Sequence, residues 1–113
     1  MMQQFNEETD GTAMDIPTGE VFEICLKENP MAGFRWDLEP RAEPACILVS
    51  EYFSREGDAP GSQGIHHWNF KAVAPGTSTI RLDYKRQWQK APPSRTFTLV
   101  IRASGSTIPL AGC

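Results

Sequence analysis

The sequence has 113 residues, 40% of them hydrophobic and 22% charged, a composition typical of one soluble globular domain. Its formal net charge of −3 argues against a nucleic-acid partner, because such proteins need a basic face that neutralises phosphates. No apolar run approaches the roughly 20 residues of a membrane-spanning helix, so we expect no membrane partner.

The first residues of the chain are polar and acidic. Residues 1–11 contain few apolar side chains and several Gln, Glu and Asn, which predicts a disordered segment. The same stretch lacks the basic start and apolar run of a signal peptide. We therefore expect a cytoplasmic protein, or a periplasmic or secreted one if a leader precedes this sequence.

Beyond this segment, apolar and polar residues alternate in one short stretch after another. The clearest example is Ile80, Leu82 and Tyr84, which alternate with Arg81 and Asp83. Period-two alternation with one polar face is typical of antiparallel strands. Strands are predicted in seven stretches, namely residues 13–17, 22–26, 34–38, 47–53, 68–72, 80–84 and 97–101.

Turn-forming residues separate these stretches, and nine prolines and nine glycines interrupt any long helical pattern. The spacing predicts an all-β fold, an immunoglobulin-like antiparallel β-sandwich of about seven to eight strands over residues 12–104. Residues 105–113 are predicted to form a flexible tail. The Cys…Trp…Cys pattern of antibody domains is absent, so the likeness to them is one of architecture.

The cysteines and histidines are candidate catalytic or metal-binding groups. The chain has three cysteines, so at least one thiol is unpaired. Cys25 and Cys46 lie in apolar stretches, which favours packed thiols; a disulfide between them is the alternative. Cys46 with His66 or His67 is a second alternative, as a nucleophile with its base. Adjacent histidines on a strand point to opposite faces and do not share one metal, so we expect no metal.

Other catalytic patterns are missing. There is no Gly-x-Ser-x-Gly nucleophile elbow. The glycine-rich stretch at residues 57–64 precedes a strand, whereas a phosphate-binding loop precedes a helix. We expect no enzyme activity and no cofactor.

Three segments between predicted strands have an unusual composition. In the first, Pro30 and Gly33 restrain a turn whose tip carries Met31 and Ala32. The second, residues 57–64, is rich in glycine and exposes backbone to a partner chain. The third carries Trp88, a residue type that often anchors protein interfaces. Ordinary turns are the alternative interpretation of each.

Together these segments resemble the chagasin family of inhibitors of papain-like cysteine proteases. That family carries an Asn-Pro-Thr-Thr-Gly-aromatic loop, a Gly-x-Gly-Gly loop and an Arg-Pro-Trp loop, in this order. The matching residues here are Asn29-Pro30-Met31-Ala32-Gly33-Phe34 followed by Trp36, Gly61-Ser62-Gln63-Gly64, and Arg86-Gln87-Trp88. The resemblance covers about residues 18–104.

The resemblance implies a reversible, competitive inhibitor, expected to be a monomer, whose partner is a papain-like cysteine protease. By analogy with the family, the three loops gather at one end of the sandwich, and the loop from Asn29 to Phe34 enters the protease cleft. Met31 and Ala32 then lie above the catalytic nucleophile, while the other two loops clamp its sides.

The chain departs from the family motifs at four positions. Met31 and Ala32 replace threonines, Gln63 replaces a glycine and Gln87 replaces a proline. Each change predicts a loop that is less rigid or less able to approach a partner closely. The rival hypothesis is a non-inhibitory immunoglobulin-like binding module for adhesion or carbohydrate, in which Trp36 and Trp88 stack on sugar rings.

Overall fold

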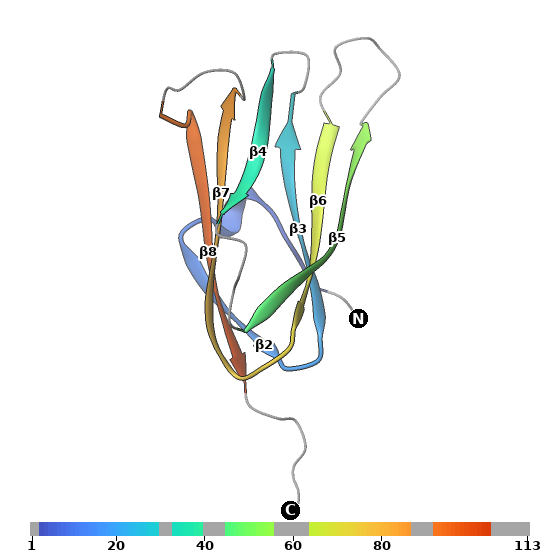
Figure 1. The fold of residues 1–113 in the computed structure, drawn as a ribbon, viewed down its shortest axis with the longest axis vertical. Helices are drawn as coiled ribbons and strands as arrows, with labels where there is room; N and C mark the ends of the chain where they lie inside the picture. The colour runs from blue at the N-terminus through green and yellow to red at the C-terminus, as the bar shows by residue number, and fades with distance from the viewer. Residues whose placement is uncertain (1–2, 30–32, 40–44, 56–63, 87–91, 105–113) are drawn as a thin grey trace, which may run out of the picture.

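The computed structural model describes residues 3–29, 33–39, 45–55, 64–86 and 92–104 (Figure 1). These residues form eight strands and one short 3-10 helix, η1. The elements are β1 (Gln3–Phe5), η1 (Glu7–Thr9), β2 (Thr12–Pro17), β3 (Val21–Glu28), β4 (Phe34–Glu39), β5 (Cys46–Arg55), β6 (Gly64–Ala72), β7 (Gly76–Arg86) and β8 (Arg95–Ser104). No helix in this part of the chain is long and apolar enough to span a membrane.

The strands form two four-stranded sheets that face each other. Sheet A has the order β1-β3-β6-β5, and sheet B has the order β2-β8-β7-β4. Figure 1 shows the long strands of both sheets running along the long axis of the molecule. The sandwich and the seven stretches predicted from alternation are confirmed, since each stretch lies within one of β2 to β8.

The expectation of purely antiparallel pairing is wrong for two strand pairs. β1 pairs with β3 in parallel, and β2 pairs with β8 in parallel. Parallel neighbours need a long connection instead of a hairpin. Between β1 and β3 of sheet A, the chain crosses to sheet B, forms β2 and returns, and this is the long connection. The other parallel pair, β2 and β8, comes from opposite ends of the sequence.

The predicted disorder of residues 1–11 is also wrong over the described part of that segment. Phe5 is 7% exposed, and its ring centroid lies 6.0 Å from that of Phe22. The Asn6 side chain caps η1 by accepting from the backbone N–H of Glu8 at 2.9 Å. One buried aromatic ring and a strand pairing therefore order a stretch whose overall composition is polar. The predicted tail, residues 105–113, lies outside the described residues.

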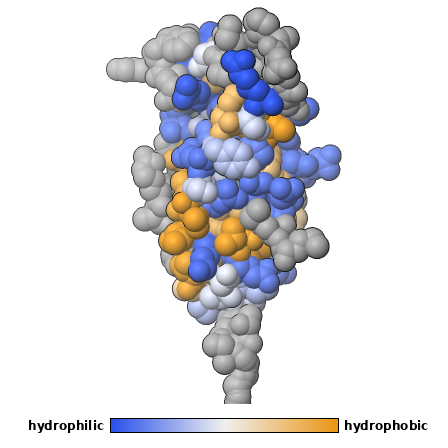
Figure 2. Space-filling view, turned by 90° about the vertical axis from the view of Figure 1, so that its right-hand side faces the viewer, coloured by the Kyte–Doolittle hydropathy of each residue, from blue (hydrophilic) through white to orange (hydrophobic). Residues whose placement is uncertain are grey.

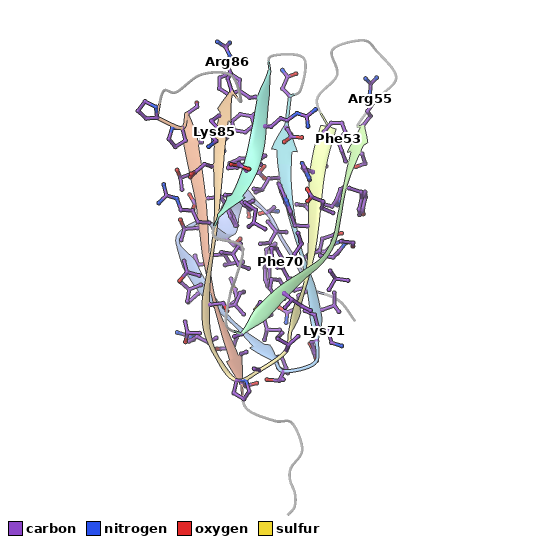
Figure 3. The ribbon with its side chains drawn as sticks, in the orientation of Figure 1. Phe53, Arg55, Phe70, Lys71, Lys85 and Arg86 are labelled. Atoms are coloured by element: carbon purple, nitrogen blue, oxygen red, sulfur yellow. The ribbon has the colours of Figure 1, made fainter. Side chains whose placement is uncertain are left out.

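The core lies between the sheets and follows the alternation of β3, β6, β7 and β8. Phe22 and Phe70 stack across neighbouring strands with ring centroids 5.5 Å apart. Figure 3 labels Phe70 and the next residue, Lys71, which are buried and exposed in turn. The largest fully buried side chains include Trp68, Phe22, Phe97, Ile16, Ile24, Leu26, Ile80, Leu82, Leu99 and Ile101.

Strand β5 departs from this alternation. It is the edge of sheet A, and its pairing with β6 shifts register between Leu48 and Ser50. Five of its large apolar residues are exposed, namely Ile47, Leu48, Val49, Tyr52 and Phe53. Figure 2 faces the side on which β5 lies in Figure 1, and apolar patches are visible on that surface. An edge strand with a register shift does not present one constant face to the core.

Candidate functional site

The strands that flank the three sequence motifs meet at one end of the sandwich, called the loop end below. There β3, β5 and β7 end, and β4, β6 and β8 begin. Within sheet A, Gly64 is opposite both Glu28 and Arg55. Within sheet B, Phe34 is opposite Arg86. Figure 3 labels Arg55 and Arg86 at this end.

The described residues cover part of each motif. Asn29, Gly33 and Phe34 of the first motif, Gly64 of the second and Arg86 of the third are described, and all five lie at the loop end. The other predicted site residues lie outside the described residues. They are Pro30, Met31, Ala32, Gly61, Ser62, Gln63, Gln87 and Trp88.

Residues of the first and third motifs are in direct contact. The Arg86 guanidinium lies over the Phe34 ring, 4.7 Å from its centroid, a cation–π arrangement. The Phe34 ring also stacks on Tyr84, with centroids 5.2 Å apart. The backbone N–H of Asn29 donates to the Tyr84 hydroxyl at 3.0 Å. Tyr84 therefore joins both ends of the first motif to β7, which leads into the third.

Two motif glycines have a backbone or packing requirement. Gly33 has φ 84°, in the left-handed region that favours glycine. At Gly64, an added Cβ would overlap the Phe53 ring and lie 2.5 Å from the carbonyl oxygen of Ser54. The second motif thus needs its last glycine so that β5 and β6 can approach closely.

A buried carboxylate connects the two sheets beneath the loop end. Glu28 is 5% exposed and accepts a 2.8 Å hydrogen bond from the backbone N–H of Trp36 on the edge strand β4. His66 Nδ1 lies 3.2 Å from Glu28 Oε1, and its Nε2 lies 2.8 Å from Glu51 Oε2. The His66 ring also stacks on Trp68 at 4.0 Å.

The charge on His66 follows from these neighbours. Burial lowers the pKa of the imidazole, but the hydrogen bonds to Glu28 and Glu51, together with their negative charges, outweigh burial and raise the pKa of His66 above its usual value. The protonated ring donates to both carboxylates. The sequence did not single out Glu28, His66 and Tyr84 as a group, because their contacts depend on how the sheets face each other.

Trp36 is a structural residue of the loop end. It is 6% exposed, its indole N–H donates to the carbonyl oxygen of Lys27 at 2.8 Å, and its ring packs 4.7 Å from Tyr84. The rival hypothesis needed Trp36 at the surface to stack on a sugar, and that expectation is wrong.

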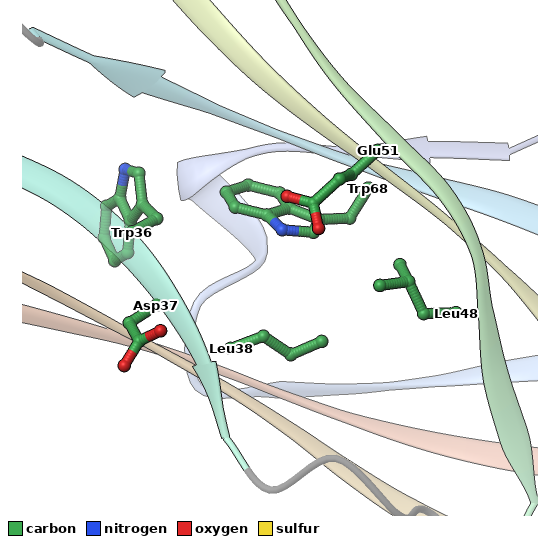
Figure 4. Close-up of a pocket in the computed structure, with 6 residues that line it drawn as sticks. All are labelled: Trp36, Asp37, Leu38, Leu48, Glu51 and Trp68. Carbon is green, nitrogen blue, oxygen red and sulfur yellow. The ribbon is translucent and has the colours of Figure 1, made fainter.

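A hollow of about 240 Å³ lies between the edge strands β4 and β5 (Figure 4). It is lined by Trp36, Asp37, Leu38, Leu48, Glu51 and Trp68. The lining offers two carboxylates, Asp37 and Glu51, and no Ser, Thr, Cys, Lys or His side chain.

The structure does not place Cys46 beside His66 or His67, the pairing considered for a nucleophile and its base. Cys46 is 2% exposed and lies opposite Ala72, at the far end of β6 from the histidines. Cys25 is the thiol beside a histidine, with its Sγ 3.4 Å from His67 Nδ1. Burial, followed by the hydrogen bond and charge of Glu23, raises the pKa of Cys25 to about 12. A thiol with this pKa is a poor nucleophile at neutral pH.

Cys25 and Cys46 are both free thiols, so the alternative of a disulfide between them is wrong. The prediction that His66 and His67 point to opposite faces is confirmed. His66 contacts Glu28 and Trp68 of the interior, and His67 contacts Cys25 and Tyr52 on the outer face of sheet A.

Comparison with known proteins agrees with this arrangement. Chagasin from Trypanosoma cruzi is 27% identical over 110 residues, spanning 92% of this chain and all of the relative. Amoebiasin-1 from Entamoeba histolytica is 31% identical over 100 residues, spanning 84% and 93% of the two chains. The crystal structure of the cysteine protease inhibitor EhICP2 from Entamoeba histolytica superposes with a TM-score of 0.80 at 26% identity, covering 90% of this chain and 95% of that one.

The family model described as "Chagasin family peptidase inhibitor I42" matches residues 15–101, which span all three motifs and every strand from β3 to β7. The resemblance in the motifs is therefore confirmed over most of the chain. This protein belongs to the chagasin family of peptidase inhibitors.

Proposed function

We propose that this protein is a reversible, competitive inhibitor of papain-like cysteine proteases, and that it binds them with the loop end of the sandwich. The observation that carries the proposal is the meeting of the three motifs there. The Arg86–Phe34 contact joins the third motif to the first, and the Asn29–Tyr84 hydrogen bond joins the first motif to β7. Gly64 of the second motif lies opposite Glu28, the residue before Asn29.

The first motif is proposed to enter the catalytic cleft. Pro30 restricts its own backbone φ angle, and Gly33 adopts φ 84°, two restraints that favour a turn in the bound inhibitor. In the proposed complex, Met31 and Ala32 lie above the protease nucleophile. A turn held away from the extended geometry of a substrate does not reach the arrangement needed for attack on its backbone. It therefore blocks the cleft without being cleaved.

The second and third motifs are proposed to grip the two sides of the cleft. Residues Gly61 to Gly64 present backbone to the protease, and Trp88 supplies the apolar anchor. Interfaces commonly gain most of their affinity from a few aromatic or arginine residues at the centre of the contact. Arg86 is engaged by Phe34, so its part in this proposal is to hold the third motif in place beside the first.

The four departures from the family motifs bear on affinity. Gln63 in place of glycine makes the second motif bulkier and less able to approach a protease closely, and Gln87 in place of proline leaves the third motif more conformational freedom to lose on binding. The contacts below the first motif favour affinity, because they restrict the two ends of that motif before binding. Glu28, Trp36 and Tyr84 connect the two sheets directly below the first motif, so the loop ends start from fixed positions.

Titration of papain with the protein tests the proposed function. We expect activity to fall in proportion to added protein and the inhibition to be relieved by substrate. Trp88→Ala is expected to raise the inhibition constant tenfold or more, about 1.4 kcal/mol, with an unchanged circular dichroism spectrum. Arg102→Ala, which removes an exposed ion pair with Asp15 away from the loop end, is the matched control and should inhibit as the wild type does.

Failure of the wild-type protein to inhibit papain would contradict the proposal. An equal inhibition constant for Trp88→Ala and the wild type would also contradict it. A carbohydrate-binding module, the rival hypothesis, would leave papain activity unchanged at any concentration.

A further inference from the structure

A cluster of three potential metal ligands lies on the outer face of sheet A. It consists of Glu23 and Cys25 from β3 and His67 from β6, and Cys25 and His67 are opposite each other in the strand register. Phe22, Ile24 and Leu26 face the core, so Glu23 and Cys25 share the opposite face of β3. Glu23 is only 3% exposed, although it lies on this outer face.

The separations of the sulfur, the ring nitrogen and the carboxylate are close to those in a tetrahedral zinc site, with the sulfur and the nitrogen approaching different oxygens of Glu23. Bonds of about 2.3 Å to sulfur and about 2.0–2.2 Å to nitrogen and oxygen at tetrahedral angles place neighbouring ligand atoms about 3.2–3.6 Å apart. Here Cys25 Sγ lies 3.4 Å from His67 Nδ1 and 3.2 Å from Glu23 Oε1. His67 Nδ1 lies 3.5 Å from Glu23 Oε2.

We propose that Glu23, Cys25 and His67 bind one Zn²⁺ ion through a thiolate, an imidazole nitrogen and a carboxylate oxygen. This mixture of soft and harder donors suits zinc, whereas Mg²⁺ and Ca²⁺ prefer oxygen ligands alone. Binding replaces the proton on the Cys25 thiol with the Zn–S bond, and that proton passes to the buffer.

Neighbouring side chains hold the three ligands in position. The Ser54 hydroxyl lies 2.9 Å from His67 Nε2, the ring nitrogen that does not face the cluster. Gln4 Nε2 donates to Glu23 Oε1 at 2.8 Å. The Tyr52 ring stacks on the His67 ring, with centroids 4.2 Å apart and planes 5° from parallel. Such outer contacts fix the tautomer and orientation of ligands in metal sites.

A hollow of about 330 Å³ gives solvent a route to the cluster. Cys25 and His67 are in its lining, together with Gln4 and Glu7. The hollow leaves room for a water molecule as the fourth ligand, as in zinc sites with three protein ligands. Glu7 adds negative charge near Cys25, which favours a cation, and Lys27 in the same lining opposes it.

The neighbouring histidine shows why this cluster differs from an ordinary ion pair. His66 also lies between two carboxylates, but Glu28 and Glu51 face its two different ring nitrogens, so those groups do not converge on one point. In the Glu23–Cys25–His67 cluster, all three donors lie within 4.8 Å of one another. The expectation of no metal did not include a mixed site of one thiol, one histidine and one carboxylate from two paired strands.

The test uses the full chain with Cys113→Ser, because the third thiol would otherwise add a second zinc-binding group. Zinc is measured by equilibrium dialysis with metal analysis and by competition with a chromogenic chelator. We expect one Zn²⁺ per chain, and affinity at least tenfold lower in the Cys25→Ser and His67→Gln variants. His66→Gln, which changes the neighbouring histidine on the opposite face, should bind zinc as the parent does.

Replacement of zinc by Co²⁺ gives a readout on the parent protein itself, so this test does not depend on whether a variant folds. We expect a thiolate-to-cobalt charge-transfer band and strong visible bands typical of four-coordinate Co²⁺. Zinc should also raise the Tm of the parent, but not that of Cys25→Ser. Absence of the charge-transfer band, a stoichiometry near zero, or zinc affinity that survives both ligand substitutions would overturn the proposal.

Discussion

The chain has two tyrosines, and they offer a matched pair of substitutions that test how the first motif is held. Tyr84→Phe removes the hydroxyl that accepts the 3.0 Å hydrogen bond from the Asn29 backbone, while its ring can keep its contacts with Phe34 and Trp36. Tyr52→Phe removes the other hydroxyl, which lies 3.4 Å from Glu23 on the outer face of sheet A.

The magnitude follows from one hydrogen bond at a half-buried site. Loss of such a bond costs about 1 kcal/mol, which corresponds to a Tm lower by about 4 °C for a domain of this size. The N–H of Asn29 is then less fixed in the free inhibitor and must be ordered again on binding. If that full amount is lost on binding, the inhibition constant rises about fivefold.

The assay is a papain inhibition constant for each variant beside a thermal unfolding curve. Tyr84→Phe should weaken inhibition about fivefold, and Tyr52→Phe should leave it unchanged. An unchanged inhibition constant for Tyr84→Phe, together with the lower Tm, would refute the reasoning. It would show that the bond stabilises the domain but does not prepare the first motif for binding.

Three further predictions concern the loop end. Gly33→Val should weaken papain inhibition, because a left-handed backbone costs a β-branched residue at least about 1–2 kcal/mol; equal potency would contradict this. Gly64→Ala should lower the free energy of unfolding by about 1–3 kcal/mol in urea titrations, since its Cβ would meet the Ser54 carbonyl; an unchanged midpoint would show that β5 moves freely. The raised pKa of His66 adds stability below its unfolded value of about 6.5 that is lost as pH rises through the higher folded value. The Tm should therefore fall more in the wild type than in His66→Gln as pH rises from about 6.5 through the higher folded pKa of His66, and parallel curves would contradict this.

The strands could be predicted from sequence because their inner faces are mostly apolar. Alternation identified β3, β6, β7 and β8, whose buried residues recur at every second position. β1 was missed because Phe5 is its one buried residue and the rest of the segment is polar. The parallel pairings were missed because alternation identifies a strand but not its neighbour in the sheet.

The motifs predicted where the candidate site lies, but not what supports it. The resemblance to the chagasin family implied one end of a sandwich, and the described motif residues lie there. The contacts of Glu28 with Trp36 and of Cys25 with His67 cross between sheets or between strands far apart in sequence. Such contacts depend on register, which a single sequence does not fix when several pairings bury the same faces.

The path of the N-terminal segment bears on how this inhibitor survives beside endopeptidases. Proteases cleave segments that can be drawn into an extended, accessible form, and residues 3–5 and 12–17 are already engaged as outer strands, one in each sheet. A protein shortened to begin at residue 12 would lose the ring of Phe5 from its place against Phe22 and expose the backbone of β3. We expect limited proteolysis to remove the first eleven residues slowly from the intact protein, and to digest the shortened one faster.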